Sequence, residues 1–252
     1  MPLMTSSEAF VETLAARGVT HVFGIVGSAY MDPLDLFEPA GIRFISVAHE
    51  QGAGHMADGY SRISNRHGVC IAQNGPGITN FVTPIKTAYW NHTPLLLVTP
   101  QTANKTIGQG GFQEVEQMAL FKEMVCYQEE VRDASRMAEV LNRVIEKAWR
   151  GSAPAQINVP RDLWTQVIDI ALPPIVRLER SSGGGDSVAE AAKLLSEANF
   201  PVILSGAGVV LGGAITDCAA LAERLDAPVC LSLIHISEPT RRTPISYAVF
   251  CL

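Results

Sequence analysis

The sequence predicts an α/β protein in which a parallel-sheet domain is followed by the start of a second α/β domain. Short apolar runs alternate with helical stretches as far as Val159, and this alternation implies a parallel sheet covered by helices on both faces. A Gly-rich segment, Ser181 to Gly185, then precedes a new helix and strand pattern, which indicates a domain linker. With 252 residues, 47% of them hydrophobic, the chain can bury the core of one large or two smaller domains.

The first domain begins with a helix whose start and end are both signalled. Thr5 and Glu8 have the spacing of a capping box, and Gly18 is placed to end the helix. Strands and intervening helices are expected to follow, with one long helix over residues 134–149. The strands are expected at residues 22–25, 43–47, 69–72, 95–99, 127–131 and 155–159.

The second unit has the pattern of a single βαβ repeat. A helix is expected from Asp186 to about residue 199, a strand at 201–205, a helix ending near 225 and a strand from 228. Gly206, Gly208 and Gly212 resemble a dinucleotide-binding fingerprint, but the third glycine is one residue late and no acidic residue ends a following strand. Tight packing of the strand against the helix is therefore the preferred interpretation.

The sequence changes character at Leu231. Residues 231–252 show neither helical periodicity nor a strand followed by a helix. The string resembles the conceptual translation of a transposon adapter used in sequencing libraries. We therefore expect residues 231–252 to be a non-native tail, and the natural protein to be longer.

Composition excludes several classes of function. The net charge is −6 and the Lys and Arg residues are dispersed, which argues against a nucleic-acid or anionic-membrane surface. The apolar run Leu95 to Val98 is too short to span a bilayer, and no secretory signal precedes it. The five cysteines form no Cys-x-x-Cys pair, as is typical of reduced thiols in a cytoplasmic protein.

Glu50 is the most informative single residue. It lies where the strand at 43–47 runs into a helix rich in Gly and Ala, so it is expected at the edge of the sheet where α/β proteins bind ligands. The alternative is a carboxylate that only stabilises the first helical turn. A zinc-protease motif is excluded because a second His is required four residues after His49, where the chain has Ala53.

Three Gly-rich loops are expected at the same edge. They are residues 24–28, 73–80 and 108–114, and each follows a strand. The loop at 73–80 could cradle a phosphate on backbone N–H groups, but Pro76 supplies none. Close approach of the backbone to a flat ring is the better use of its glycines.

The order of these four loops resembles the pyrimidine-binding domain of thiamine-diphosphate enzymes of the acetolactate synthase superfamily. The stretches 71–82, 86–94, 104–117 and 124–133 are most similar to the sulfoacetaldehyde acetyltransferases within it. Acetolactate synthases usually have Gly-Tyr-Pro-Gly-Gly where this chain has Gly24-Ile-Val-Gly-Ser28, and Asp-Ala-Phe-Gln-Glu where it has Gly110-Gly-Phe-Gln-Glu114. The resemblance covers residues 4 to about 230 of a family more than twice this length.

The resemblance implies a division of the chain and a set of site residues. Residues 4–165 correspond to the pyrimidine-binding domain, 166–186 to a linker and 187–230 to the truncated beginning of the central domain. Glu50 matches the glutamate that hydrogen-bonds the N1′ atom of the aminopyrimidine, which activates the cofactor. The other implied residues are Gly27, Ser28, Pro76 and Asn80 for cofactor binding, Gln113 for catalysis, and His92, Lys105 and Phe112 for the substrate.

The resemblance also implies the reaction and its partners. Sulfoacetaldehyde and phosphate would be converted to acetyl phosphate and sulfite, with thiamine diphosphate and Mg²⁺ as cofactors, in a cytoplasmic homodimer or homotetramer of sulfonate metabolism. The Mg²⁺ and diphosphate would be held by a Gly-Asp-Gly segment of a C-terminal domain. The only Gly-Asp pair here is Gly185-Asp186, followed by Ser187, so this polypeptide alone is expected to be inactive.

Two other functions stay open at this point. The first is an acetolactate synthase-like carboligase that acts on 2-oxoacids, which would share Glu50 and the Gly-Pro-Gly turn. The second is a non-catalytic binding protein built from a solitary pyrimidine-type domain. An assay of sulfite release against acetolactate formation separates the two enzymes. A natural stop codon soon after Cys230 would support the non-catalytic binding protein, and a reading frame that continues into a third domain would exclude it.

Overall fold

The computed structural model describes residues 3–170, 172–174 and 183–231. The chain divides into two compact units, with the boundary between residues 178 and 179. The first unit carries all of the predicted site residues.

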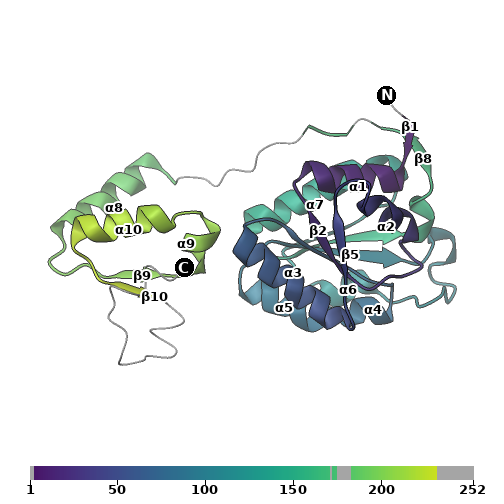
Figure 1. Cartoon of the computed structure of the whole chain (residues 1–252), viewed down its shortest axis with the longest axis horizontal. Helices are drawn as coiled ribbons and strands as arrows, with labels where there is room; N and C mark the ends of the chain where they lie inside the picture. The colour runs from purple at the N-terminus through teal and green to yellow at the C-terminus, as the bar shows by residue number, and fades with distance from the viewer. Residues whose placement is uncertain (1–2, 171, 175–182, 232–252) are drawn as a thin grey trace. The chain divides into compact units, whose positions relative to one another are not determined.

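The first unit is built on a six-stranded parallel sheet with the strand order β3-β2-β4-β5-β7-β6. Figure 1 labels two of these strands, β2 and β5. Every neighbouring pair of these strands is parallel, as the alternation of apolar runs and helices predicts. The carboxyl ends of the strands therefore meet at one edge of the sheet. The strands are β2 (His21–Gly24), β3 (Arg43–Ser46), β4 (Gly68–Ile71), β5 (Leu95–Gln101), β6 (Tyr127–Glu130) and β7 (Ala155–Pro160).

Helices cover both faces of this sheet (Figure 1). On one face lie α1 (Ser6–Ala16), α2 (Met31–Phe37) and α7 (Met137–Gly151). On the other lie α3 (Glu50–Ser64), α4 (Pro76–Thr79), α5 (Val82–Trp90) and α6 (Gln117–Phe121). Single-turn 3₁₀ segments η1 (Asn104–Thr106), η2 (Ala134–Arg136) and η3 (Arg161–Leu163) complete the unit.

Two hydrophobic cores form because successive strand residues point to opposite faces. In β5, Leu96 and Val98 join the core beneath α1 and α7, while Leu95 and Leu97 join the core beneath α3 and α5. All seven residues of β5 are buried, and a strand covered on both faces reads as a continuous apolar run. The cores fix the sheet on which the carboxyl-edge loops stand.

The predicted capping box at the first helix is confirmed. Thr5 is the N-cap residue of α1, its Oγ1 accepts the backbone N–H of Glu8 at 3.1 Å, and the Glu8 carboxylate accepts the Thr5 N–H. Gly18 follows with φ +75°, a left-handed conformation that suits glycine. Both signals act within a few residues of sequence, which is why they can be seen before any tertiary contact is known.

The first unit extends further along the chain than residue 165. The short strand β8 (Val167–Asp169) pairs antiparallel with β1 (Leu3–Thr5) in a separate two-stranded sheet. Part of the segment 166–186, expected to be a linker, is therefore structured. Three-residue strands carry no visible periodicity, and this pair joins segments more than one hundred and fifty residues apart.

The second unit has the predicted order of elements. It contains α8 (Gly185–Glu197), β9 (Ile203–Ser205), α9 (Ala207–Leu211), α10 (Ile215–Leu225) and β10 (Val229–Leu231), and β9 pairs parallel with β10. Residues 207–211, expected as part of a Gly-rich turn, form the short helix α9. Leu231, the first residue of the predicted non-native tail, ends β10, and residues 232–252 lie outside the described residues.

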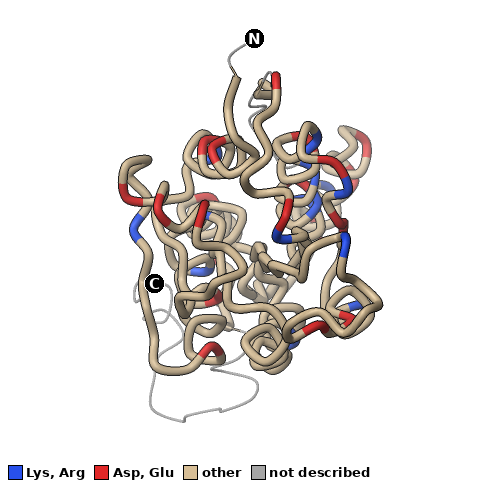
Figure 2. Tube along the Cα trace, turned by 90° about the vertical axis from the view of Figure 1, so that its right-hand side faces the viewer, with Lys and Arg blue, Asp and Glu red and all other residues tan. Residues whose placement is uncertain are grey.

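Charge is mixed over the described part of the chain. Lys and Arg positions are interspersed with Asp and Glu positions along the trace (Figure 2). Within the described ranges, no helix combines the length and the apolar character needed to cross a lipid bilayer.

Candidate cofactor and substrate site

The predicted site residues lie in the loops that leave the carboxyl ends of the strands, with one exception. Glu50 is the first residue of α3, the helix that follows β3. Its N-cap is His49, whose Nδ1 accepts the backbone N–H of Gln51 at 3.1 Å. The helix therefore has a cap of its own, and the Glu50 carboxylate is left for other partners.

Glu50 is joined to Asn80 across two loops. The Asn80 side-chain amide donates a hydrogen bond from Nδ2 to Oε2 of Glu50 at 2.9 Å. Asn80 directly follows α4, the short helix that leaves β4. The structure thus brings together two residues that lie thirty positions apart in the sequence and fixes one carboxylate oxygen.

The other carboxylate oxygen of Glu50 borders a space that glycine keeps open. A Cβ atom at Gly77 would lie 3.3 Å from Glu50 Oε1 and 3.2 Å from the Cβ of Ala72, closer than most real Cβ contacts. Gly52, in the first turn of α3, has no atom near the position of its missing Cβ. An acceptor oxygen beside backbone without side chains fits a flat ring with an N–H group on its edge.

The loop at 73–80 is not built to cradle a phosphate. The N–H of Gly75 donates to Oε1 of Gln117 at 3.2 Å, and that of Ile78 donates to the carbonyl of Gln73 at 3.1 Å. Pro76 begins α4 and has no N–H. These donors are already used, in agreement with the sequence expectation that the loop approaches a ring rather than an anion.

Gln113 is held in a strained conformation by neighbouring loops. Its φ of 55° is unusual for a residue with a side chain, and such strain concentrates at functional sites. Nε2 of Gln73 donates to Oε1 of Gln113 at 3.1 Å, and Nδ2 of Asn74 donates to the carbonyls of Phe112 at 2.8 Å and Gln113 at 3.1 Å. The Glu114 carboxylate accepts backbone N–H groups of the same loop.

The first loop joins the same network. Oε1 of Gln73 accepts the N–H of Ala29 at 3.0 Å, so Gln73 links the loops after β2, β4 and β5. A Cβ at Gly27 would lie only 2.6 Å from that oxygen, which explains why the position is glycine. Ser28, between them, is exposed.

The buried Tyr30 holds this loop through a hydrogen bond. Burial and the nearby negative charge of Glu50 raise the pKa of the Tyr30 hydroxyl, which donates a hydrogen bond to the carbonyl of Ile25. Nε1 of Trp164 donates to the carbonyl of Ala29 at 3.0 Å. Tyr30 therefore stays protonated and fixes the loop as a hydrogen-bond donor.

The three predicted substrate residues are placed differently. Phe112 lies beside Gln113, with a side chain that is 74% exposed. Lys105 is in η1, after β5, and is also at the carboxyl edge. His92 lies in the turn between α5 and β5, before the strand begins, and so belongs to the opposite edge of the parallel sheet. The structure does not bring His92 to the other site residues.

A cavity of about 240 Å³ opens among these loops. Ser28, Gln73, Asn74 and Phe112 line it from the loops after β2, β4 and β5, and Arg161 lines it from the end of β7. Sequence reasoning missed Arg161. The sequence does mark this position, because Arg161 directly follows a strand of the parallel sheet. Glu50, Gln73 and Ser28 likewise lie within a few residues of the ends of their strands.

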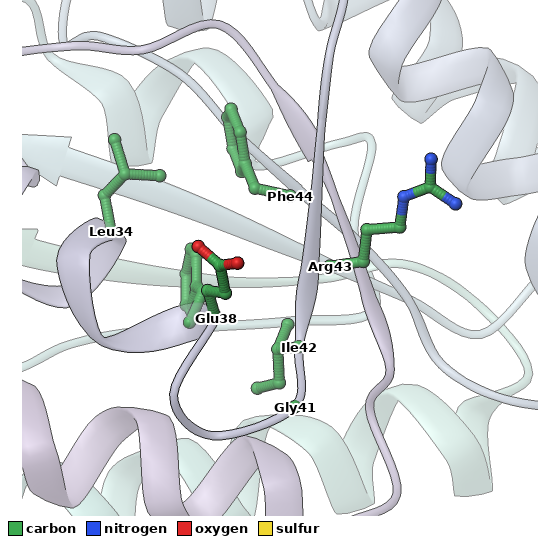
Figure 3. Close-up of a pocket in the computed structure, with 7 residues that line it drawn as sticks. Leu34, Glu38, Gly41, Ile42, Arg43 and Phe44 are labelled. Carbon is green, nitrogen blue, oxygen red and sulfur yellow. The ribbon is translucent and has the colours of Figure 1, made fainter.

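A larger cavity, of about 490 Å³, lies between α2 and the edge strand β3. Figure 3 shows Leu34, Glu38 and Phe44 around it, while the Arg43 guanidinium points away from them. Arg43 begins β3, so this hollow is at the amino edge of that strand. Without polar groups that converge on it, it does not have the character of a substrate site.

Two family descriptions match the chain. "Thiamine pyrophosphate enzyme, N-terminal TPP binding domain" fits residues 4–120, and "Thiamine pyrophosphate enzyme, central domain" fits residues 188–239. The second match ends inside the segment 231–252. Together they agree with the predicted order of a pyrimidine-type domain and a central domain.

Curated relatives are similar over nearly the whole chain. It is 68% identical over 232 residues to a "Probable sulfoacetaldehyde acetyltransferase" of Rhizobium meliloti (strain 1021), covering 92% of this chain and 39% of that protein. It is 67% identical over 249 residues to a "Sulfoacetaldehyde acetyltransferase" of Roseovarius nubinhibens, covering 97% of this chain and 41% of that protein. A "Probable acetolactate synthase large subunit" of Methanocaldococcus jannaschii is 36% identical over 239 residues, covering 92% of this chain and 40% of that protein.

A solved structure has the same fold. The thiamine diphosphate-dependent 4-hydroxybenzoylformate decarboxylase of Rhodococcus jostii RHA1 superposes with a TM-score of 0.79 at 28% identity, over 90% of this chain and 44% of that one. The chain thus spans less than half the length of the relatives and of the solved structure that it matches.

Proposed function

The chain belongs to the thiamine pyrophosphate enzyme family, and from that premise we propose that it is the N-terminal part of a sulfoacetaldehyde acetyltransferase. The whole enzyme converts sulfoacetaldehyde and phosphate to acetyl phosphate and sulfite. The observation that carries the proposal is the difference in identity, 52–68% to five sulfoacetaldehyde acetyltransferases against 36% to the acetolactate synthase.

Glu50 and Asn80 are the residues that we assign to the aminopyrimidine of the cofactor. Asn80 holds one oxygen of the carboxylate, and Oε1 of Glu50 is left to share a proton with a ring nitrogen. We assign Gly27, Ser28 and Pro76, in the loops after β2 and β4, to the surface that surrounds the cofactor ring. When bound, thiamine diphosphate supplies a nucleophilic carbon that adds to carbonyl groups, and the protein orients and tunes it.

Gln113 is the residue that we assign to the reacting end of the substrate. Its strained backbone and its hydrogen bond from Gln73 hold the side chain in one place relative to the first loop. Preorganised polar groups of this kind contribute to catalysis because they need no rearrangement during the reaction. Phe112, next to it, covers the cavity with an apolar ring, and Lys105 adds a positive charge at the same edge.

The finer parts of the proposal follow from the same family. Mg²⁺ accompanies the diphosphate, the enzyme is a cytoplasmic homo-oligomer, and its reaction belongs to sulfonate metabolism and taurine degradation. Oxygen ligands suit Mg²⁺, and the Gly185-Asp186-Ser187 segment of this chain does not supply the Gly-Asp-Gly pattern expected for them.

The test uses the whole-length enzyme, which we define as the protein encoded by the uninterrupted genomic reading frame through Cys230 and beyond. Sulfite release from sulfoacetaldehyde is measured with thiamine diphosphate, Mg²⁺ and phosphate, and acetolactate formation from pyruvate is measured in parallel. We expect phosphate-dependent sulfite release. Acetolactate formation without sulfite release would assign the chain to the carboligases instead.

A further inference from the structure

We propose that Arg161 binds the tetrahedral oxyanion of a substrate, either the sulfonate of sulfoacetaldehyde or inorganic phosphate. The inference rests on the proposed function, because it names the residue that recognises the charged group at the same site. It starts from the cavity at the carboxyl edge of the sheet.

The wall of this cavity selects for negative charge. Among the described residues that line it, Arg161 is the only charged one, and no carboxylate is present. The remaining polar residues are neutral, namely Ser28, Gln73, Asn74, Gln101, Thr102 and Thr106. Its volume of about 240 Å³ is below the roughly 300–1,000 Å³ of pockets for drug-sized ligands, so a small substrate fits it better.

The neutral amides of the wall are already hydrogen-bonded to the protein. Gln73 is bonded to Ala29, Asn74 and Gln113. Gln101 donates from Nε2 to the carbonyl of Val115 at 2.9 Å and accepts the N–H of Thr102 through Oε1. Both Nε2 hydrogens of Gln73 are therefore used within the protein, as is one of the two on Gln101, and these bonds fix the shape of the cavity.

The threonine hydroxyls are occupied as well. Oγ1 of Thr106 donates to the carbonyl of Ala103 at 2.9 Å, and the hydroxyls of Thr102 and Thr106 lie 3.3 Å apart. A hydroxyl has one hydrogen, so Thr102 is the donor within this pair. The side-chain donors left on the described wall are one Nε2 hydrogen of Gln101, the Ser28 hydroxyl and the Arg161 guanidinium, and only the guanidinium is charged.

Arg161 is free to take an external anion. It is exposed, and no carboxylate in the described part of the chain lies within ion-pair distance of its guanidinium. The neighbouring Asp162 is engaged through Oδ1 by the N–H of Asn104 at 2.9 Å. A guanidinium presents a planar set of donors that matches two oxygens of a sulfonate or phosphate.

The substitution Arg161→Gln in the whole-length enzyme tests this assignment. We expect the KM for sulfoacetaldehyde or for phosphate to rise about tenfold to a hundredfold, with kcat within a few-fold of the wild type, because a charge-assisted hydrogen bond is lost. Arg161→Lys should recover part of the loss, because lysine keeps the positive charge but lacks the planar set of donors that can bind two oxygens at once. Arg132→Gln is the matched control, because Arg132 follows the neighbouring strand β6 and its side chain is 86% exposed.

Binding without turnover is measured by calorimetric titration of the same proteins with methanesulfonate and with inorganic phosphate. A raised KM for sulfoacetaldehyde together with loss of methanesulfonate binding would show that Arg161 binds the sulfonate. A raised KM for phosphate together with loss of phosphate binding would show that it binds phosphate. Unchanged KM values and unchanged titrations in Arg161→Gln would overturn the inference, as would a fall in kcat alone. If the wild type releases no sulfite, the proposed function fails, and the titrations still judge Arg161 separately.

Discussion

At the scale of single residues, the candidate site contains one carboxylate, Glu50, whose two oxygens have different surroundings. Asn80 occupies Oε2 of Glu50, and the Gly77 backbone leaves Oε1 open. A helix-start carboxylate with only a structural role would need neither feature, and α3 is capped by His49 without it. The geometry therefore favours a functional role for Glu50.

Glu50→Gln should keep the fold of the whole-length enzyme and lower kcat by about a hundredfold or more, because an amide cannot share a proton with a ring nitrogen. The measurement is steady-state sulfite release, with circular dichroism to show that the fold is intact. Glu38→Gln, at the exposed cavity on the opposite edge, should behave like the wild type. Equal activity in both variants would return Glu50 to a helix-start role.

Single residues were predictable where one rule placed them. Glu50, Asn80 and Gln113 follow strands of a parallel sheet, so their convergence could be expected from sequence. His92 precedes its strand, and the same rule assigns it to the other edge. Arg161 obeyed the rule but was overlooked, because no glycine-rich loop marks it.

At the scale of elements, the loop after β4 supports the loop that carries Gln113. Gly75 has φ +68°, and a Cβ there would lie 2.3 Å from the carbonyl oxygen of Gln113. The two loops therefore pack backbone against backbone at this point. Such an approach is possible only without a side chain.

Gly75→Ala should destabilise the first unit by about 1–3 kcal/mol and displace Gln113, since the new methyl group meets backbone at a strained φ. Urea unfolding followed by tryptophan fluorescence measures this, because Trp90, Trp149 and Trp164 all lie in the first unit. Gly59→Ala is the control. Gly59 is within α3 with open space around it, and alanine there should gain up to about 1 kcal/mol. A Gly75→Ala protein as stable as the wild type would contradict this packing.

A buried histidine makes the first unit sensitive to acid. Burial, with a smaller effect of the nearby Arg17 charge, lowers the pKa of His67 to about 4 from the ordinary 6.5. Within the described chain its Nδ1 has no hydrogen-bond partner, and its ring packs on Trp149 at a centroid distance of 5.3 Å. His67 is therefore neutral in the folded state at pH values where the unfolded chain binds a proton.

The sign of the effect follows from linkage. Above about pH 6.5, His67 is neutral in both states and does not affect the free energy of unfolding. As the pH drops from there toward 4, the free energy of unfolding should fall by up to about 3 kcal/mol, because only the unfolded state takes up the proton in that interval. Urea unfolding at several pH values measures this slope. His67→Phe should flatten it, whereas His55→Gln, at an exposed position, should not. The same slope in His67→Phe and in the wild type would exclude His67 as its source.

Elements were predictable where their signal was local. The strands of the main sheet and the first helix agree with expectation to within one or two residues, because apolar periodicity and capping act over short distances. The β1–β8 pair was missed because its stability comes from contacts between distant segments. Its consequence is a first unit that includes part of the expected linker.

At the scale of the whole molecule, the proposed assignment gives this chain only part of the cofactor site. In the first unit we propose that the Glu50 carboxylate and the space beside Gly77 take the ring, and the chain's only Gly-Asp pair lies at the start of α8 in the second unit. A negatively charged diphosphate gains little binding free energy from this chain if no cation neutralises it. We therefore expect cofactor binding to depend on segments beyond this chain.

The 252-residue polypeptide should give no binding heat with micromolar thiamine diphosphate and Mg²⁺ in a calorimetric titration. The whole-length enzyme is the positive control under the same conditions. Micromolar binding by the shorter chain would mean that the diphosphate is held by residues of these two units, and the division of roles between them and a C-terminal domain would be wrong.

A competition between substrates in one reaction tests the proposed function most directly. The whole-length enzyme receives equal concentrations of sulfoacetaldehyde and pyruvate with phosphate, thiamine diphosphate and Mg²⁺, and sulfite, acetyl phosphate and acetolactate are quantified together. We expect sulfite and acetyl phosphate in equal amounts, no product when phosphate is omitted, and little acetolactate. Acetolactate as the main product, with no sulfite, would refute the assignment to the sulfoacetaldehyde acetyltransferases.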